Sequence, residues 1–262
     1  MRFYIFTFIS WVMFFSCSNV EKTNITFSGQ VKNTDEAIVK VSNYNSTLKE
    51  EIDIDSLGYF SGSFKIDKKG YYYFQIGRSY TTVFFSPGHE VNVSIDADSF
   101  FHYLSYSGTL KKENNYNVAK SKLRSKFVGN AKDYFVVPLE EFQNKIEKTQ
   151  SALLDLLEKN NDLSPETKAI EKRVIYYEYL QSYNNYQKFY SYHKKTNAKL
   201  PDDYYDPIIN MDLNDDEMFR YCRAYRNLVV ENFRHSSKEA LSKDVGIDIV
   251  DFVRDRIKKI SS

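Results

Sequence analysis

The side chains in this 262-residue chain that could do chemistry are two cysteines and four histidines. Cys17 and Cys222 lie far apart and form no Cys-x-x-Cys pair, so they lack the spacing of a redox dithiol. No histidine has a cysteine or a second histidine at metal-ligand spacing; the four are His89, His102, His193 and His235. The chain also has no Gly-x-Ser-x-Gly, the turn that carries a serine nucleophile. We therefore expect no catalytic residue, no metal site and no cofactor.

A short acidic stretch has the spacing that begins a calcium-binding loop, with acidic or amide side chains at Asp212, Asn214 and Asp216. Such a loop needs glycine at its sixth position and a bidentate glutamate at its twelfth. The chain has Glu217 and Arg223 there. Glu217 instead stands three positions after Asn214, which is the spacing of a capping box. We therefore expect Asn214 to begin a helix.

Cys17 follows a segment that is typical of an export signal. Arg2 gives the segment a positive start, and residues 3–15 form an apolar run. A membrane-spanning helix needs about 20 apolar residues, so this run is too short to cross a bilayer. The small Ser16 before Cys17 resembles a bacterial lipoprotein signal, in which the cysteine is acylated. The sequence therefore predicts a signal peptide at residues 1–16 and a lipid on Cys17. The lipid would anchor the protein to the inner or outer membrane of the cell envelope, facing the periplasm or the cell surface.

Plain secretion with cleavage nearby is the alternative, because Phe14 and Phe15 are bulkier than the residues usual in lipoprotein signals. If Cys17 is acylated, Cys222 has no partner for an intramolecular disulfide. We then expect Cys222 to be a small, buried apolar side chain on a helix.

The composition limits the class of partner. Lys and Arg number 36 against 35 Asp and Glu, so the chain lacks the basic excess that nucleic-acid binding usually shows. The chain has 22 Tyr and 20 Phe but one Trp. One predicted helix is rich in tyrosine, which could offer a stacking surface for sugars or peptides, although packing in a core is the favoured interpretation. Its tyrosines are Tyr176, Tyr177, Tyr179, Tyr183, Tyr186, Tyr190 and Tyr192.

Residues from about 24 to 108 alternate between apolar and polar side chains, as half-buried strands do. Turn residues separate the runs at 33–35, 56–58, 67–70 and 86–88. Regularly spaced short strands without a helix between them predict a β-sandwich. The side chains expected to face its core include Ile25, Phe27, Val31, Phe60, Phe64, Phe74, Val83, Phe85, Val91 and Val93.

After Gly108 the apolar spacing changes to three and four residues, which is typical of helices. We expect one helix to begin at Pro138 and another at Ser164-Pro165. A third would begin at Asn214 and carry Phe219, Cys222, Leu228, Val229 and Phe233 on its buried face. A last amphipathic segment would carry Ile247, Val250, Val253 and Ile257.

The predicted fold class is therefore α+β by segregation, with an antiparallel β-sandwich over residues 18–108 followed by a helical bundle over residues 109–262. The polar run at 111–115 lies between the two periods. We expect it to be an exposed link, and we expect limited proteolysis to cut first between Thr109 and Lys126.

Several stretches together resemble a known family. They are Asp55-Ser56-Leu57-Gly58-Tyr59-Phe60, the strand that leads into Ser86-Pro87-Gly88-His89, the positions Phe100, Leu104, Ser107 and Gly108, and the helical stretches 200–205, 213–217 and 225–227. They are similar to the N-terminal β-domain and helical spacer of Bacteroidetes-type thioredoxin-like, or thiol-disulfide interchange, lipoproteins. His89 replaces the aspartate that is usual after Pro-Gly in that family. The resemblance implies a C-terminal thioredoxin domain with Cys-x-x-Cys, which this chain lacks, so no catalytic residue carries over.

Three functions fit these observations. The one we predict is a non-catalytic envelope lipoprotein that binds or scaffolds a partner, such as an envelope protein. The second is the N-terminal portion of a thiol-disulfide oxidoreductase whose thioredoxin domain is missing from this chain. The third is a glycan- or peptide-binding lipoprotein that uses the tyrosine-rich helix.

Overall fold

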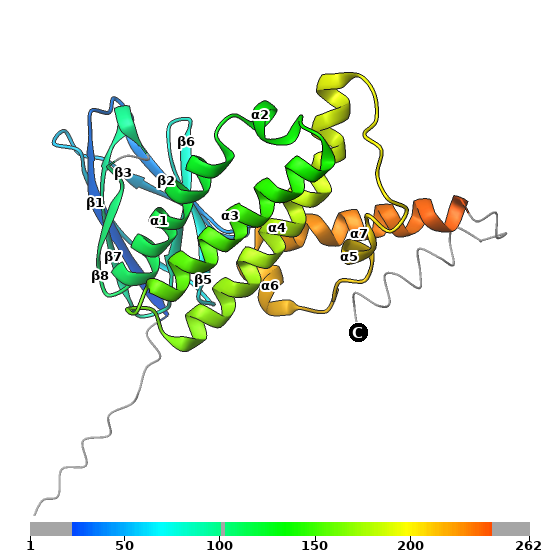
Figure 1. Ribbon diagram of the computed structural model, residues 1–262. Helices are drawn as coiled ribbons and strands as arrows, with labels where there is room; N and C mark the ends of the chain where they lie inside the picture. Colours follow the sequence, from blue (N-terminus) through cyan, green and yellow to red (C-terminus); the bar gives the residue numbers. More distant parts are fainter. Residues whose placement is uncertain (1–22, 101–102, 243–262) are drawn as a thin grey trace, which may run out of the picture.

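Strands come first along the chain and helices follow, as the change of period predicts. The computed structural model describes residues 23–100 and 103–242. The predicted lipidation site Cys17 and the predicted C-terminal segment with Ile247 lie outside these residues. Figure 1 shows the strands gathered at one end of the molecule and the helices at the other. The fold is therefore α+β with segregated elements.

The strands form two four-stranded sheets, ordered β4-β1-β7-β8 and β3-β2-β5-β6. Their bounds are β1 Asn24–Lys32, β2 Ile38–Ser42, β3 Lys49–Asp53, β4 Tyr59–Lys65, β5 Gly70–Ile76, β6 Ser79–Phe85, β7 Glu90–Asp96 and β8 Ser105–Gly108. Most neighbours are antiparallel, but β1 and β7 are parallel, with Phe27 opposite Val91. The predicted antiparallel sandwich is confirmed apart from this one pair, which was not expected because alternation shows which face a side chain takes and not the direction of the neighbouring strand.

The apolar faces of the two sheets pack against each other, and Phe27 lies at the centre of the core. Its ring meets those of Phe60, Phe74 and Phe85 edge-on, each with centroids 5.2 Å apart. Edge-on aromatic pairs add to the gain from burial. Truncation of such a buried ring to alanine costs about 3–5 kcal/mol.

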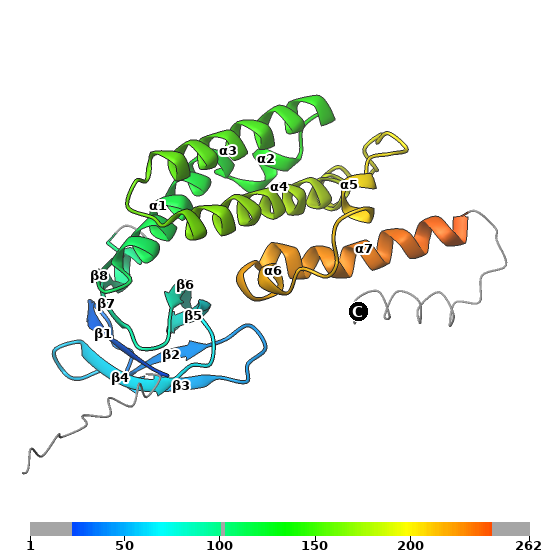
Figure 2. The ribbon, with the colours of Figure 1, turned by 90° about the horizontal axis from the view of Figure 1, so that it is seen from below.

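The helices have the bounds α1 Lys111–Val128, α2 Ala131–Phe135, α3 Leu139–Lys159, α4 Pro165–Lys194, α5 Asp206–Ile209, α6 Asp216–Tyr221 and α7 Arg223–Ser242, with a short 3-10 turn η1 at Ala97–Ser99. Figure 2 shows α4 between α3 and α7. The start of α4 is as predicted, because the side chain of Ser164 accepts a hydrogen bond from the N–H of Thr167 at 3.1 Å and Pro165 is the first helical residue. Pro138 stands directly before α3 as its N-cap.

The predicted helix from Asn214 is two helices. Asp215, and not Asn214, caps α6, and its side chain accepts from the N–H of Met218 at 3.0 Å. Cys222 has extended backbone angles, φ −117° and ψ 108°, which end α6 and turn the chain into α7. Because of this break, Phe219 does not share the buried face of Leu228 and is exposed. An apolar spacing that continues through a break cannot reveal the break.

Helix α1 was not predicted, and it covers one open side of the sandwich. Asn114 is fully buried, and its side chain binds the edge strand β6 twice. Its Oδ1 accepts from the N–H of Phe84 at 2.7 Å, and its Nδ2 donates to the carbonyl of Phe84 at 3.0 Å. Asn115 makes the same pair of bonds with Tyr106 in β8, the edge strand of the other sheet, at 2.9 and 2.8 Å. One helix therefore caps both sheet edges.

The expectation that residues 111–115 form a link between the two parts is wrong, because these residues begin α1. Lys111, Lys112 and Asn115 are exposed, as expected, but Asn114 is buried and its amide bonds to β6. The outer face of β5 and β6 is also covered by helices, since the rings of Tyr71 and Phe84 pack against Tyr221 of α6. The β part and the helical part thus share a packed interface. Independent folding of residues 18–108 stays a prediction.

Candidate functional site

The three histidines that the structure describes do not come together. His89 lies in the turn before β7, with its Nδ1 2.9 Å from the carbonyl oxygen of Pro87. His193 is exposed near the end of α4, His235 lies on α7, and His102 is outside the described residues. Among the described side chains, no three His, Cys, Asp or Glu residues gather as metal ligands would.

Cys222 is buried at the break between α6 and α7, as expected for an apolar cysteine. Its Sγ accepts a hydrogen bond from the N–H of Tyr225 at 3.4 Å. Burial raises the pKa of the thiol to about 11. A thiol with a raised pKa is protonated at neutral pH and is a poor nucleophile, because only the thiolate reacts.

The tyrosine-rich helix α4 uses most of its rings for packing. Tyr177 and Tyr186 are buried, and Tyr186 stacks on Phe142 of α3 with centroids 4.5 Å apart. Tyr183 stacks on Tyr204 at 4.0 Å. The packing interpretation of this helix is therefore confirmed for these residues, and they form no open stacking surface.

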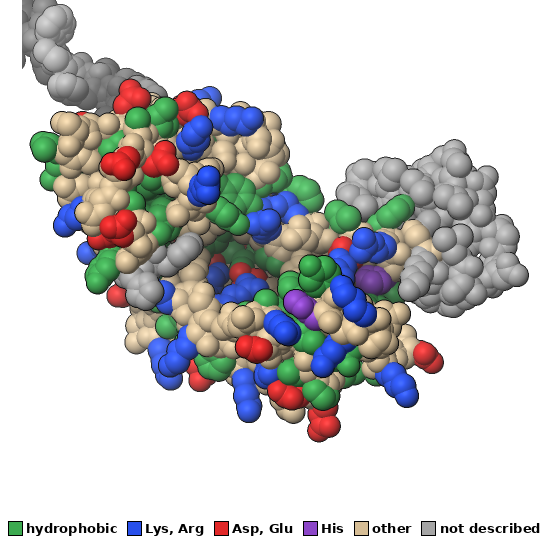
Figure 3. Space-filling model, turned by 90° about the horizontal axis from the view of Figure 1, so that it is seen from above, with side chains coloured by type: hydrophobic (Ala, Val, Ile, Leu, Met, Phe, Trp, Pro, Cys, Tyr) green, Lys and Arg blue, Asp and Glu red, His purple; other side chains and the backbone are tan. Residues whose placement is uncertain are grey.

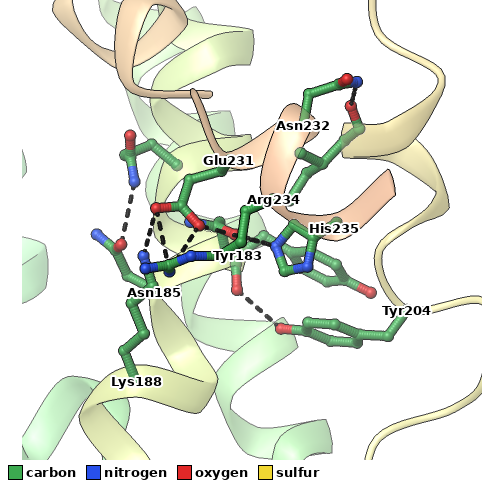
Figure 4. A network of polar contacts seen from close by, with 11 residues as sticks. Tyr183, Asn185, Lys188, Tyr204, Glu231, Asn232, Arg234 and His235 are labelled. Carbon is green, nitrogen blue, oxygen red and sulfur yellow. Dashed lines mark hydrogen bonds and ion pairs between the residues drawn. The ribbon is translucent and has the colours of Figure 1, made fainter. Parts of the chain in front are cut away.

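A polar network ties α4 to α7 next to these rings (Figure 4). Glu231 accepts from Lys188 at 2.6 Å and from Arg234 at 3.2 Å. Nε2 of His235 lies 2.9 Å from Oδ1 of Asn184. The network joins side chains of two packed helices. Among the described residues, the structure shows no ligand cavity beside it. We read it as structural.

The largest hollows lie between the outer face of the sheet β3-β2-β5-β6 and the bend from α6 into α7. Three adjoining cavities of about 370, 490 and 190 Å³ share lining residues. Figure 3 shows a hollow between the β part and the helical part, with basic and acidic side chains inside it. We call it the tyrosine–arginine cleft, after the residues Tyr44, Tyr73, Tyr80, Arg220, Arg223 and Arg226.

The sheet supplies the tyrosines of this cleft. Tyr73 lies on β5 next to the buried Phe74, so the alternation that puts Phe74 into the core directs Tyr73 outward. Tyr80 lies on β6 opposite Gln75 and is 55% exposed. Tyr44 comes from the loop between β2 and β3. The rings therefore follow from the strand period and one hairpin loop.

The bend between α6 and α7 supplies the arginines. Arg220 is in the last turn of α6, whereas Arg223 and Arg226 begin α7. Arg226 is held in place, because its Nη1 donates to the carbonyls of Phe219 at 2.7 Å and Arg220 at 3.2 Å. Its guanidinium also lies 4.6 Å from the centroid of the Tyr44 ring, a cation–π distance.

Among the described residues, the three arginines at the bend have no carboxylate partner. No carboxylate there forms an ion pair with Arg220, Arg223 or Arg226. Three other arginines are paired: Arg124 lies 3.1 Å from Glu178, Arg173 contacts two carboxylates at the start of α6, and Arg234 lies 3.2 Å from Glu231. The entrance to the cleft is therefore positive.

The back of the cleft is electrically balanced. Nζ of Lys120, on α1, donates to Oε2 of the buried Glu171 on α4 at 2.7 Å. The hydroxyl of Tyr71 donates to the other oxygen of Glu171 at 2.7 Å. Burial lowers the pKa of Lys120, but Glu171 and Glu178 together hold it above its usual value. Lys120 and Arg124 thus cancel Glu171 and Glu178, so only the entrance can attract an anion.

The sequence held one signal for this site. Arg220, Arg223 and Arg226 recur at intervals of three residues. The spacing could have indicated a basic helix face. The tyrosines that meet these arginines come from at least 140 residues earlier in the chain, and no local pattern connects them. In chemical terms the cleft can bind an anion and stack a ring.

None of the described helices is long and apolar enough to cross a membrane. No protein-family model matches the sequence, and no curated protein matches it. Among solved structures, part of the chain is similar to a crystal structure described as a "putative cell adhesion protein" from Bacteroides ovatus ATCC 8483. The identity is 11%, the match covers 34% of this chain and 44% of the other, and the TM-score is 0.23. The match spans less than half of either chain, and a TM-score this low does not establish a shared fold.

Proposed function

We propose that this protein is a non-catalytic module of the cell envelope that binds an anionic partner in the tyrosine–arginine cleft. The observation that carries the proposal is the set of three arginines without a carboxylate partner among the described residues. Like charges placed close together repel one another, so the arrangement is most favourable when an anion lies between them. Arginine is also the side chain best suited to hold a carboxylate or phosphate through two parallel hydrogen bonds.

The location in the envelope rests on the N-terminal sequence, where Ser16-Cys17 closes an apolar run too short to span a bilayer. Acylation of Cys17 would hold the module at a membrane surface, since each buried methylene contributes about 0.8 kcal/mol. The partner would then be met at that surface. No thiol chemistry is part of this proposal, because the described cysteine, Cys222, is buried and protonated.

Calorimetric titration of the full-length protein in detergent tests the anion site. The probes are tetraglutamate, tetragalacturonate and inorganic sulfate. Replacement of Arg223 or Arg226 by serine should weaken binding of the best probe by about tenfold, the equivalent of 1.4 kcal/mol. Arg78 is a matched control, because it is an exposed arginine in the β5–β6 turn that does not line the cleft. An affinity that Arg223→Ser and Arg226→Ser leave unchanged, or reduce no more than Arg78→Ser, would refute the proposal.

A further inference from the structure

We infer that the anionic partner is an acidic oligosaccharide, whose carboxylates bind the arginines while its sugar rings lie on the tyrosines. The inference rests on the proposed function and names the class of its ligand. It is carried by the chemistry of the cleft walls and by the position of the exposed rings.

The rings in the cleft are placed for stacking. Tyr80 is 55% exposed and Tyr44 is 38% exposed, although both line cavities. Tyr73 lies between them on the same sheet face, one strand away from Tyr80. Tyrosine offers an apolar ring face and a polar hydroxyl tip, which suits a partner with both apolar C–H faces and hydroxyl groups. A pyranose ring is such a partner.

The remaining wall also carries amide and hydroxyl groups. Asn43, Asn45 and Thr47 line the cavity beside Tyr44, and Gln75 and Asn227 line the one beside Tyr80. Amides both donate and accept hydrogen bonds, as the hydroxyls of a sugar do. A lipid chain would need a mainly aliphatic wall. Leu48 and Ile66 are the aliphatic side chains that line the cavity beside Tyr44, where they stand among charged and polar residues.

An extended peptide is a poorer fit for this cleft. Peptides often bind by adding a strand to a free sheet edge. The edge strand next to the cleft, β6, is already capped, because Phe84 bonds to Asn114 and the carbonyl of Thr82 accepts from Asn117. A ligand in the cleft must therefore be recognised through side chains. This favours rings and carboxylates over a peptide backbone.

The arginines are the groups that would recognise the carboxylates of the oligosaccharide. The side chain of Arg226 is held in place by two carbonyls and by the ring of Tyr44. Part of the entropy that this side chain would lose on binding a ligand is therefore already lost in the free protein. Arg223 is exposed beside it. A guanidinium binds a carboxylate through two hydrogen bonds. A sulfate ester offers similar oxygens, so the test must separate the two sources of charge.

The experiment is calorimetric titration of the full-length protein in detergent with four probes: tetragalacturonate, maltotetraose, sulfated maltotetraose, and tetraglutamate. Tetragalacturonate should bind at least about tenfold more tightly than the neutral maltotetraose and than tetraglutamate, a difference of 1.4 kcal/mol or more. Sulfated maltotetraose carries sulfate esters and no carboxylate, so a preference for it would keep the acidic sugar as the ligand but show that the charge recognised is sulfate.

Variants of Tyr80 test the stacking. Tyr80→Ala should weaken binding of tetragalacturonate by about tenfold, the equivalent of 1.4 kcal/mol, because it removes a face on which a sugar ring can lie. It should weaken binding of tetraglutamate by less than about twofold. Tyr80→Phe should keep the affinity. Tyr59 is the control, since it is 51% exposed on β4 and does not line the cleft.

The outcomes separate this inference from the proposed function. Tight binding of tetraglutamate that depends on Arg223 but not on Tyr80 would overturn the sugar and leave the anion site in place. Binding of tetragalacturonate that survives Tyr80→Ala would also overturn the stacking role. If no probe bound through Arg223 or Arg226, the proposed function itself would fail.

Discussion

Asn114 offers the sharpest test of how this fold is held together. Asn114→Ala removes the acceptor of the Phe84 N–H and the donor to the Phe84 carbonyl. The carbonyl of Leu110, a third partner of the side chain, still accepts from the backbone N–H of Asn114 at 3.2 Å. Two backbone groups of β6, the N–H and the carbonyl of Phe84, therefore lose the partners that the fully buried side chain of Asn114 supplies.

The expected cost follows from that count. A buried backbone group without a partner costs about 1–3 kcal/mol. Alanine has a better helix propensity than asparagine, and this offsets about 0.5 kcal/mol of the lost stability. The two groups together cost about 2–6 kcal/mol, so the free energy of unfolding should fall by about 1.5–5.5 kcal/mol, a large part of the stability of an ordinary domain.

Asn115→Ala is the matched control. Asn115 is the next residue of α1 and makes the same pair of bonds, to Tyr106 of the other sheet, but its side chain is exposed. Water can replace an exposed amide, so the loss should be about 1 kcal/mol or less. The two substitutions share the same gain in helix propensity, which cancels in the comparison.

The measurement is urea unfolding followed by circular dichroism, with the m-value checked for each variant. The wild-type protein and both variants would begin at Ser18, so that the acyl group is absent. Equal losses for the two variants would show that burial of the amide is not what matters. A loss below about 0.5 kcal/mol for Asn114→Ala would refute the claim that α1 stabilises the sheet edge.

The other predictions concern the anchor, the buried charges, the thiol and the loops. Cys17→Ala should release the protein from membranes, and mass spectrometry of the wild-type protein should find acyl chains on Cys17; an unmodified N-terminus elsewhere would contradict this. Lys120→Met should destabilise by about 3–5 kcal/mol in urea unfolding because it leaves Glu171 charged and unpaired, and the double variant with Glu171→Leu should recover most of the loss. Burial raises the pKa of the Cys222 thiol from its ordinary value of 9.0 to about 11, so the thiol contributes stability below pH 9 that is lost as the pH rises to 11; Cys222→Ala should lose less stability over that window, by up to about 2–3 kcal/mol. Among the described residues, trypsin should cut first in the exposed segment 195–203 and spare 109–126, and early N-terminal sequences within 109–126 would contradict the packing of α1.

The β part could be predicted from the sequence because its signals are local. Alternation placed Phe27, Phe74 and Val93 in the core, and all three are fully buried. The turns at 56–58 and 86–88 lie between strands, as expected. What alternation cannot show is which strands become neighbours, so the parallel pairing of β1 with β7 was missed.

The helical part was predicted where a helix buries apolar side chains, and missed where it does not. Phe142, Ile146 and Leu153 gave α3 a clear stripe. The buried residues of α1 are Asn114, Tyr116, Asn117 and Lys120, which do not form an apolar stripe. Their partners lie on β6 and α4, far away in sequence. A helix whose buried face is polar cannot be recognised before its partners are known.

The same helix links the sandwich edge to the cleft. Asn114 fixes α1 to β6, and Asn117 and Lys120 lie three and six residues further along, at the back of the cleft. Asn117 also bonds to Thr82, at 2.9 Å between Nδ2 and Oγ1, so the cleft wall on β6 and its back are joined by one helix. Because Lys120 forms an ion pair with Glu171, the back of the cleft adds no net charge to the three arginines at the entrance. The position of a ligand should therefore be set at the entrance, by Arg223, Arg226 and the ring of Tyr80, while α1 keeps that entrance at a constant distance from the sheet.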